Sequence, residues 1–177
     1  MAKLTPVQEK FVLHWGEMGT RWGVNRTVAQ IHALVYIWPQ PLNSEEIAET
    51  LSVARSNVST SLKELQGWGL VKTVHVLGDR RDHFETMKDV WEMFRVVLDE
   101  RKRREIDPTL ELLRACVAEA GQGKPEDAVT RERLEKMLDF FETMAGWYEQ
   151  VRRLPTDAAI RFVKLGGKIQ KFLGLAS

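Results

Sequence analysis

Apolar residues recur every three or four positions along most of the chain, which is the spacing of amphipathic helices. One such stripe, Val7, Phe11, Trp15, Met18 and Trp22, predicts a first helix, and Val28, Ile31, Val35 and Trp38 predict a second. Thr5 and Asn25 are suited to cap the starts of these helices, and Pro39 ends the second. We expect the tryptophans to pack the two helices together and not to form a ligand site.

Two shorter helices with a tight connection are predicted between Asn43 and Gln66. Asn43 can accept the free amide protons of the first turn, and Glu46, three residues later, completes a capping-box pattern. The apolar stripe of this helix is Ile47, Ala48 and Leu51. The next helix, from about Arg55 to Gln66, has the apolar face Val58, Leu62 and Leu65. Two such helices in succession are typical of a helix-turn-helix.

After Gly67 the pattern changes from helical to extended. The strand-type residues are Leu70, Val71, Val74, Val76, Phe84 and Thr86, and Gly78 begins a charged turn between them. A hairpin directly after a helix-turn-helix is called a wing. The helix-turn-helix and its wing together predict a winged helix-turn-helix.

The helical pattern returns beyond Met87. Val90, Trp91, Phe94, Val97 and Leu98 line one side of a helix that continues into a charged run, residues 99–105. We interpret this run as a solvated face with acids and bases paired at helical spacing, and the alternative is contact with a DNA backbone. Asp107 and Pro108 predict a kink or a fresh helix start, and the stretch GQGKPED, residues 121–127, predicts a helix break.

A wide apolar stripe follows that break. One row is Leu134, Leu138, Phe141, Ala145 and Tyr148, and the row beside it is Met137, Phe140, Met144, Trp147 and Val151. Such a width predicts burial on two sides, against the chain itself and against a second subunit. A last helix has Pro155 near its start, carries Ala159, Ile160, Val163, Ile169, Phe172 and Leu173, and has a weak point at Gly166 and Gly167. The expected assembly is a homodimer.

The predicted fold class is mainly α with a small β-hairpin wing. Residues 1–87 are expected to form a winged helix-turn-helix DNA-binding domain, and residues 88–177 a helical linker and dimerisation region. With 177 residues, of which 44% are apolar, the chain can bury a core as one domain or as two small ones.

The outward face of the helix from Arg55 to Gln66 carries the functional prediction. Ser56, Ser59, Thr60 and Lys63 lie opposite its apolar side, with Arg55 and Asn57 on the flanks. Short polar side chains allow close approach to base edges in a DNA major groove. The alternative is an ordinary solvated face, but glutamate and lysine normally dominate such faces because they favour the helix. We therefore predict that these six residues contact DNA.

Arg80 and Arg81 at the tip of the wing are predicted to contact the DNA backbone or minor groove. The alternative is a solvated hairpin in which Asp79 and Asp82 neutralise both arginines. The position of the tip, directly after the candidate recognition helix, favours DNA contact.

Three runs carry a resemblance to a known family: LSVARSNVSTSLKELQGWGLV, then GDRRDHFE, then KDVWEMFRVVLDERKRREIDP. They resemble the GbsR branch of the MarR-like winged-helix transcriptional regulators. The resemblance covers nearly the whole chain and implies a DNA-binding repressor. Some members of this branch sense choline and control glycine betaine synthesis or uptake, so the resemblance also implies choline or another osmoprotectant-related molecule as effector.

A quaternary ammonium effector needs an aromatic cage. The candidate aromatic residues near the junction of the two halves are Trp91, Phe94, Phe140, Phe141, Trp147 and Tyr148. The same residues serve equally well in a core, and we interpret them as core.

Composition narrows the function classes. The net charge is only +1, so affinity for DNA must come from local placement of cations. A single cysteine, Cys116, excludes an internal disulfide and suits the cytoplasm, and no signal peptide or long apolar span is evident. The chain is predicted to be cytoplasmic, without a membrane partner.

No enzyme motif is found: the sequence has no P-loop, dinucleotide fingerprint, nucleophile elbow or HExxH pair. The four histidines, His14, His32, His75 and His83, lack metal-ligand spacing. His75 and His83 are placed to face one another across the wing hairpin, where surface residues are the expected interpretation. We predict no catalytic residues, no cofactor and no metal.

The predicted mechanism is a homodimer that places one recognition helix per subunit in successive major grooves of double-stranded DNA. Two-fold symmetry then predicts a palindromic operator with half-sites roughly 34 to 36 Å apart. The alternative is a winged-helix module that binds another protein and no DNA. Against it, the outward helix face lacks the aromatic or aliphatic anchor that protein interfaces use.

Overall fold

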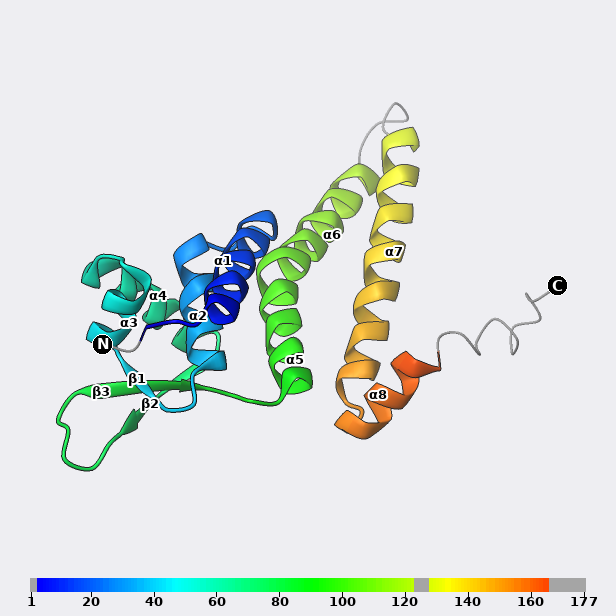
Figure 1. Ribbon diagram of the computed structural model, residues 1–177. Coiled ribbons are helices and arrows are strands. Elements are labelled where there is room, and N and C mark those ends of the chain that lie inside the picture. Colours follow the sequence, from blue (N-terminus) through cyan, green and yellow to red (C-terminus); the bar gives the residue numbers. More distant parts are fainter. Residues whose placement is uncertain (1–2, 123–127, 166–177) are drawn as a thin grey trace. The chain divides into compact units, whose positions relative to one another are not determined.

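The chain forms two compact units, Met1–Val96 and Val97–Ser177, in a computed structural model that describes residues 3–122 and 128–165 (Figure 1). The first unit contains α1 (Pro6–Arg21), α2 (Arg26–Ile37), β1 (Leu42–Asn43), α3 (Ser44–Leu51), α4 (Arg55–Gly67), β2 (Val71–His75) and β3 (Asp82–Thr86). The chain passes from one unit to the other within α5 (Val90–Arg101). The domain boundary between residues 87 and 88 stays a prediction.

Helix α2 is the centre of the first unit. Almost every side of it is covered, and its buried residues are Val28, Ala29, Ile31, His32, Ala33, Leu34 and Val35. It packs against α1, α4 and β3. Within this core the Thr86 hydroxyl donates a hydrogen bond to the Leu70 carbonyl (2.6 Å) and lies 3.4 Å from Nε2 of His32. Because Thr86 has one hydroxyl proton, Nε2 of His32 is the donor to its oxygen.

The helix caps predicted at Thr5, Asn25 and Asn43 are confirmed. Thr5 caps α1 in a capping box with Gln8, and the Asn25 side chain accepts from the Thr27 amide at the start of α2. Asn43 caps α3, its side chain accepting from the Glu45 and Glu46 amides, while the Asn43 amide donates to the Glu46 carboxylate. These bonds join residues at most three apart, which is why the sequence alone reveals them.

The buried face of α1 differs from the predicted stripe. Val7 and Trp22 are more than half exposed, and the buried residues are Val12, Gly16 and Gly19. The two glycines have no side chain, so α2 can approach there: a Cβ atom added at Gly19 would lie 2.5 Å from the Cβ of Ala29. Close backbone approach, and not the large aromatic side chains, therefore sets the main contact between these helices.

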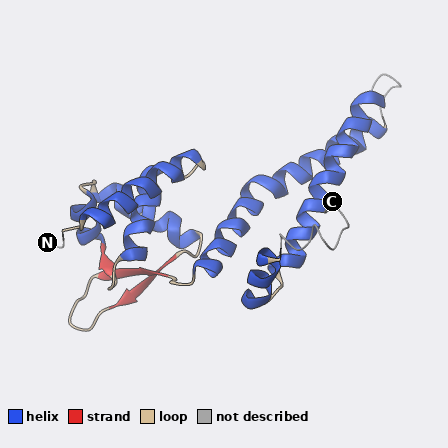
Figure 2. Ribbon diagram, turned by 45° about the vertical axis from the view of Figure 1, so that its right-hand side comes forward, coloured by secondary structure: helices blue, strands red, loops and turns tan. Residues whose placement is uncertain are grey.

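The sheet has three strands, one more than the hairpin predicted from the sequence (Figure 2). Its order is β1-β3-β2 and both pairings are antiparallel, with Leu42 opposite Phe84 and Val71 opposite Thr86. The extra strand, β1, contains only two residues, both buried. Such a short strand has no periodicity of its own, and only its pairing with β3 defines it. It anchors the start of α3 to the wing.

The predicted kink near Asp107 takes another form. Helix α5 continues through a π-helical turn, η1 (Lys102–Ile106), into α6 (Asp107–Gly121) without a capped restart. The Asp107 amide donates to the Lys102 carbonyl five residues back, and Pro108 has no amide proton to donate. Asp107 does not cap a helix, as its carboxylate instead pairs with the Lys102 ammonium at 2.7 Å.

Part of the charged run is paired along its own helix, as predicted. Arg103 pairs with Glu100 at 2.7 Å and Arg101 with Glu105 at 3.5 Å, at spacings of three and four residues. The interpretation as a solvated, internally paired face is wrong for Asp99 and Lys102. Both are half-buried and pair with residues far along the chain, Asp99 with Arg152 at 2.8 Å and Lys102 with Glu149 at 3.5 Å.

The second unit contains η1, α6, α7 (Ala128–Arg152) and α8 (Thr156–Lys164), with α6 and α7 packed side by side (Figure 1). Pro155 is the N-cap of α8, as expected of a residue near its start. The predicted break is confirmed at Gly121, where α6 ends, and the rest of it, residues 123–127, lies outside the described residues. Gly166, Gly167, Ile169, Phe172 and Leu173 also lie outside them. Within residues 3–122 and 128–165 no helix combines the length and apolar character needed to cross a membrane.

Candidate nucleic-acid interface

Helix α4 presents the polar face that the sequence predicts. Its buried residues are Val58, Ser61, Leu62 and Leu65, and all six predicted contact residues, Arg55, Ser56, Asn57, Ser59, Thr60 and Lys63, are exposed. Ser61 is a buried polar residue that the periodicity did not single out. The exposed face carries no large apolar side chain. It can therefore lie close against another surface and offer hydroxyl, amide and cationic groups to it.

A tight turn sets the direction of α4. Ser52, which follows α3, has a left-handed backbone (φ 53°), and the Val53 amide donates back to the Ala48 carbonyl at 3.0 Å. This closes α3 in the manner of a C-terminal cap. Three residues later α4 begins at Arg55, whose N-cap, Ala54, provides no side-chain bond. The helix start is thus held by the turn and by tertiary contacts.

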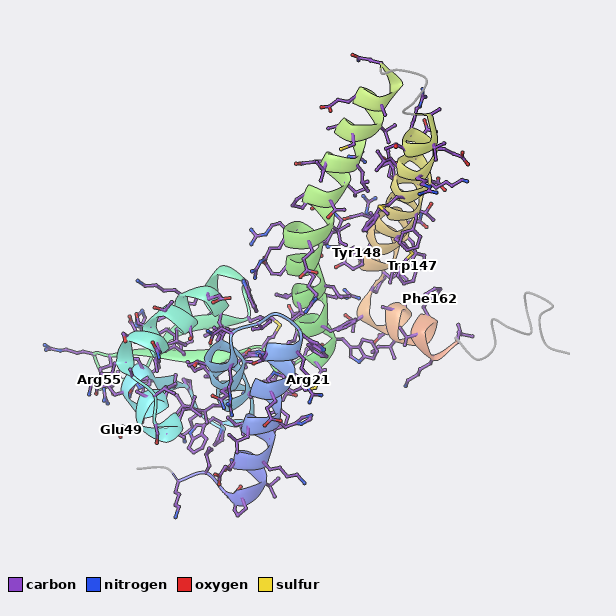
Figure 3. The ribbon with its side chains drawn as sticks, turned by 90° about the horizontal axis from the view of Figure 1, so that it is seen from above. Arg21, Glu49, Arg55, Trp147, Tyr148 and Phe162 are labelled. Atoms are coloured by element: carbon purple, nitrogen blue, oxygen red, sulfur yellow. The ribbon has the colours of Figure 1, made fainter. Side chains whose placement is uncertain are left out.

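Arg55 projects from the first turn of α4 and forms an ion pair with Glu45 of α3 (Figure 3). The Nη1 atom lies 2.9 Å from Oε1 of Glu45, and the Arg55 side chain is 72% exposed. The pair therefore sits in solvent, where such contacts contribute little to stability. It nevertheless holds one predicted DNA-contacting cation beside an acid.

The tip of the wing is organised around Arg81. Gly78 has a positive φ of 86°, and Asp79 accepts hydrogen bonds from the Arg81 amide (3.0 Å) and from its Nε atom (2.9 Å). The Arg81 Nη2 atom also pairs with Asp79, and Nη1 lies 3.2 Å from Oε2 of Glu45. These hydrogen bonds hold the pKa of the Asp79 carboxyl well below its usual range and raise the pKa of Arg81.

The two predicted wing arginines are thus different. All three guanidinium nitrogens of Arg81 have carboxylate partners, whereas Arg80 is exposed and has no ion pair among the residues that the structure describes. The alternative prediction, that acids neutralise the arginines of the wing tip, is correct for Arg81, which pairs with Asp79 and Glu45. It does not hold for Arg80. Within the described chain, Asp82 pairs with neither arginine.

The expectation that His75 and His83 face each other is wrong. The strand register places His75 opposite Asp82 and Val74 opposite His83. His75 is exposed, whereas His83 is buried and its Nδ1 lies 3.0 Å from the Arg81 carbonyl. A one-residue offset puts neighbouring side chains on opposite faces of a sheet. Among the described residues no group of three or more histidine, cysteine or acidic side chains is placed to hold a metal.

Two residues at this surface were missed as functional candidates. Locally Glu45 only adds negative charge to the first turn of α3, and its contact with Arg81 spans 36 residues, beyond any local pattern. Leu77 is fully exposed at the wing tip, where an apolar side chain can contact sugars in a minor groove. The sequence pattern places Leu77 in the hairpin and indicates nothing further about its role.

The aromatic residues proposed for a cage do not form one within either unit. Phe94, Phe140 and Trp147 are about half exposed, so the interpretation as core is wrong for these three. Tyr148 donates a hydrogen bond to Asp99 at 2.6 Å, and its pKa is raised by burial and by that bond. A cavity of about 880 Å³ lies elsewhere, between α1, α3 and the segment after α2. It is lined in part by Leu13, Trp38 and Glu49, and by none of the predicted DNA contacts.

Comparisons with known proteins agree with this geometry. Residues 22–82, which contain the helix-turn-helix and most of the wing hairpin, match the model of the MarR family. The chain is 22% identical over 141 residues to the HTH-type transcriptional repressor GbsR of Bacillus subtilis (strain 168), covering 75% of each protein.

A crystal structure of a transcriptional regulator has the same fold. The TM-score is 0.64 at 23% identity, and the similarity covers 90% of this chain and 99% of that one. The family match spans α2 to the start of β3, and the two longer similarities extend over most of the chain. Together the family match and the similarity to GbsR support a GbsR-like regulator of the MarR family.

Proposed function

We propose that this chain is a sequence-specific, DNA-binding transcription regulator that acts as a homodimer, and that it is a repressor. The observation that carries the proposal is the exposed face of α4, built from short polar side chains with cations at Arg55 and Lys63. The match of residues 22–82 to the MarR family and the similarity to a protein named as a transcriptional repressor support it.

The residues of the interface have two roles, base recognition and backbone contact. Ser56, Asn57 and Thr60 form hydrogen bonds to base edges, because short hydroxyl and amide groups fit the major groove. Arg55, Lys63 and the wing residues Arg80 and Arg81 contact phosphates or the minor groove and set affinity. Of the two wing arginines, Arg80 is the one without a carboxylate partner in the described chain. It is therefore expected to contribute the larger wing contact.

Exposed apolar residues on α7 and α8 support the homodimer. Met137, Phe140, Met144 and Trp147 are each 47 to 59% exposed, whereas the neighbouring row on α7 is half-buried within its own unit. The Trp147 ring lies 6.3 Å from that of Phe162 on α8, which extends the apolar surface (Figure 3). Two-fold pairing of this surface would present two α4 helices to a palindromic operator.

Choline or a related osmoprotectant is the proposed effector, on the strength of the resemblance to the GbsR branch alone. Titration calorimetry of the purified protein with choline tests it. The absence of binding heat at millimolar choline would remove this part of the proposal and leave DNA binding untouched.

The test of DNA binding uses the purified chain and DNA from upstream of its own gene. Binding is measured at two salt concentrations against excess unrelated DNA, and we expect competition-resistant binding that weakens steeply with salt. No preference over competitor DNA would favour a protein-interaction module or a regulator of distant genes, and selection of bound genomic fragments would choose between these.

Substitutions at Asn57 and Lys63 test these two roles. Asn57→Ala should reduce the preference for operator over unrelated DNA by about 5- to 150-fold, because a base-edge contact is worth about 1–3 kcal/mol. Lys63→Gln should weaken binding to all DNA and lower the salt slope by about one. If Asn57→Ala left discrimination unchanged while Arg80→Ala altered it, the assignment would be reversed.

A further inference from the structure

One carboxylate joins the recognition helix to the wing. Oε1 of Glu45 lies 2.9 Å from Arg55 Nη1 at the start of α4, and Oε2 lies 3.2 Å from Arg81 Nη1 on the wing. The three residues come from α3, α4 and the β2–β3 loop. Two cations predicted to contact DNA therefore share a single acid.

This arrangement resembles a guanidinium pair on a backbone phosphate. A carboxylate and a phosphodiester each carry one negative charge and two unesterified oxygens, and arginine binds both through the same N–H groups. The start of α3 itself is not an open anion site, because the Glu45 and Glu46 amides already donate to the Asn43 side chain at 3.0 Å. The anion that bridges the two arginines is the Glu45 side chain alone.

We propose that Glu45 is an internal substitute for a DNA phosphate, which pairs Arg55 with Arg81 in the DNA-free protein and releases Arg55 when DNA binds. The inference rests on the proposed function. It adds Glu45, an acidic residue, to the residues that set the affinity for DNA.

The two arginines differ in how they are held. Arg81 keeps Asp79 on its other two guanidinium nitrogens, so loss of Glu45 leaves it anchored in the wing. Glu45 is the one acid paired with Arg55 among the described ion pairs, and the side chains of this pair are 72% and 41% exposed. Phosphates can therefore reach Arg55 directly and compete with Glu45 for it. Competition by Glu45 therefore weakens binding to every DNA, whatever its base sequence.

The test is Glu45→Gln, which removes the charge and keeps the side-chain size. Binding to operator and to unrelated DNA should tighten by the same factor, about three- to tenfold at low salt, and the gain should shrink as salt screens the charges. Glu49→Gln is the matched control. It makes the same charge change on the same helix, one turn later, and Glu49 has no cationic partner within the described ion pairs (Figure 3). It should change affinity by less than about twofold.

Arg55→Gln separates competition from simple repulsion of DNA. In this background the gain from Glu45→Gln should fall to about the level of the Glu49→Gln control, because Arg55, the cation that Glu45 releases, is gone and Asp79 still holds Arg81. Arg55 is preferred to Arg81 for this variant because Arg81 also holds the wing turn. An undiminished gain would show that Glu45 merely repels phosphates and would overturn the proposal. A weakening of DNA binding by Glu45→Gln would also overturn it.

A measurement without DNA distinguishes failure of this inference from failure of the proposed function. The Nε–H resonances of Arg55 and Arg81 in the DNA-free protein should both shift on Glu45→Gln and stay in place on Glu49→Gln. If neither shifts, the shared ion pair does not exist in solution. If they shift but the wild-type protein binds no DNA, it is the proposed function that fails.

Discussion

His32 is a histidine kept neutral by its position in the core. Burial lowers its pKa from 6.5 to about 4, and its Nε2 donates to the buried Thr86 hydroxyl oxygen. Between these two pH values the unfolded chain binds a proton at this residue that the folded chain does not. Stability therefore increases with pH through this window.

The resulting prediction is a loss of stability on acidification. From pH 7 down to pH 4 the free energy of unfolding should fall by up to about 3 kcal/mol on account of His32. Denaturant unfolding at several pH values measures this, and His32→Gln should flatten the dependence in that window. The exposed His14→Gln is the control and should leave the slope unchanged. Equal slopes in the wild type and His32→Gln would contradict the assignment.

At the scale of elements, the contact between α1 and α2 depends on two glycines with different surroundings. A Cβ at Gly19 would meet the Ala29 Cβ, which is fixed to the α2 backbone, at 2.5 Å. A Cβ at Gly16 would meet Cγ of Gln30 at 2.6 Å, part of a flexible side chain. The Ala29 Cβ can move away from Gly19 only if the two helices separate.

The two alanine substitutions should therefore have opposite effects. Gly16→Ala gains up to about 1 kcal/mol of helix propensity and should be neutral or stabilising. Gly19→Ala makes the same gain but overpacks the interface, at a cost of about 1–3 kcal/mol, and should lower the melting temperature. Thermal unfolding of the two variants measures the difference. Equal stability would mean that α2 does not approach α1 at Gly19.

At the scale of the whole molecule, the proposed homodimer would link assembly through the apolar row on α7 to DNA binding. Met144 is 47% exposed in this row, and a lysine there would place a charge in the proposed subunit interface. Met144→Lys should yield a monomer by sedimentation and weaken operator binding by about a hundredfold, since the two half-sites would then be bound independently. Gln150→Lys, at an exposed polar position of the same helix outside the row, should remain dimeric. A dimeric Met144→Lys variant would place the interface elsewhere.

Much of this protein follows from its sequence because the determining interactions are local. The caps at Thr5, Asn25 and Asn43 act over two or three residues, and the buried and exposed faces of α4 follow from helical periodicity. The order of helix, turn, helix and hairpin needed no further information. The helical periodicity also identified the six exposed polar residues of α4.

The tertiary structure decided what depends on residues far apart in the chain. Strand β1 exists because Leu42 pairs with Phe84, and the face of α1 that is buried was decided by how closely α2 approaches two glycines. The difference between Arg80 and Arg81 depends on Glu45, which no periodicity or local spacing connects to the wing. Local patterns fix how each segment folds, whereas the charge of the proposed DNA-binding surface depends on which segments the fold brings together.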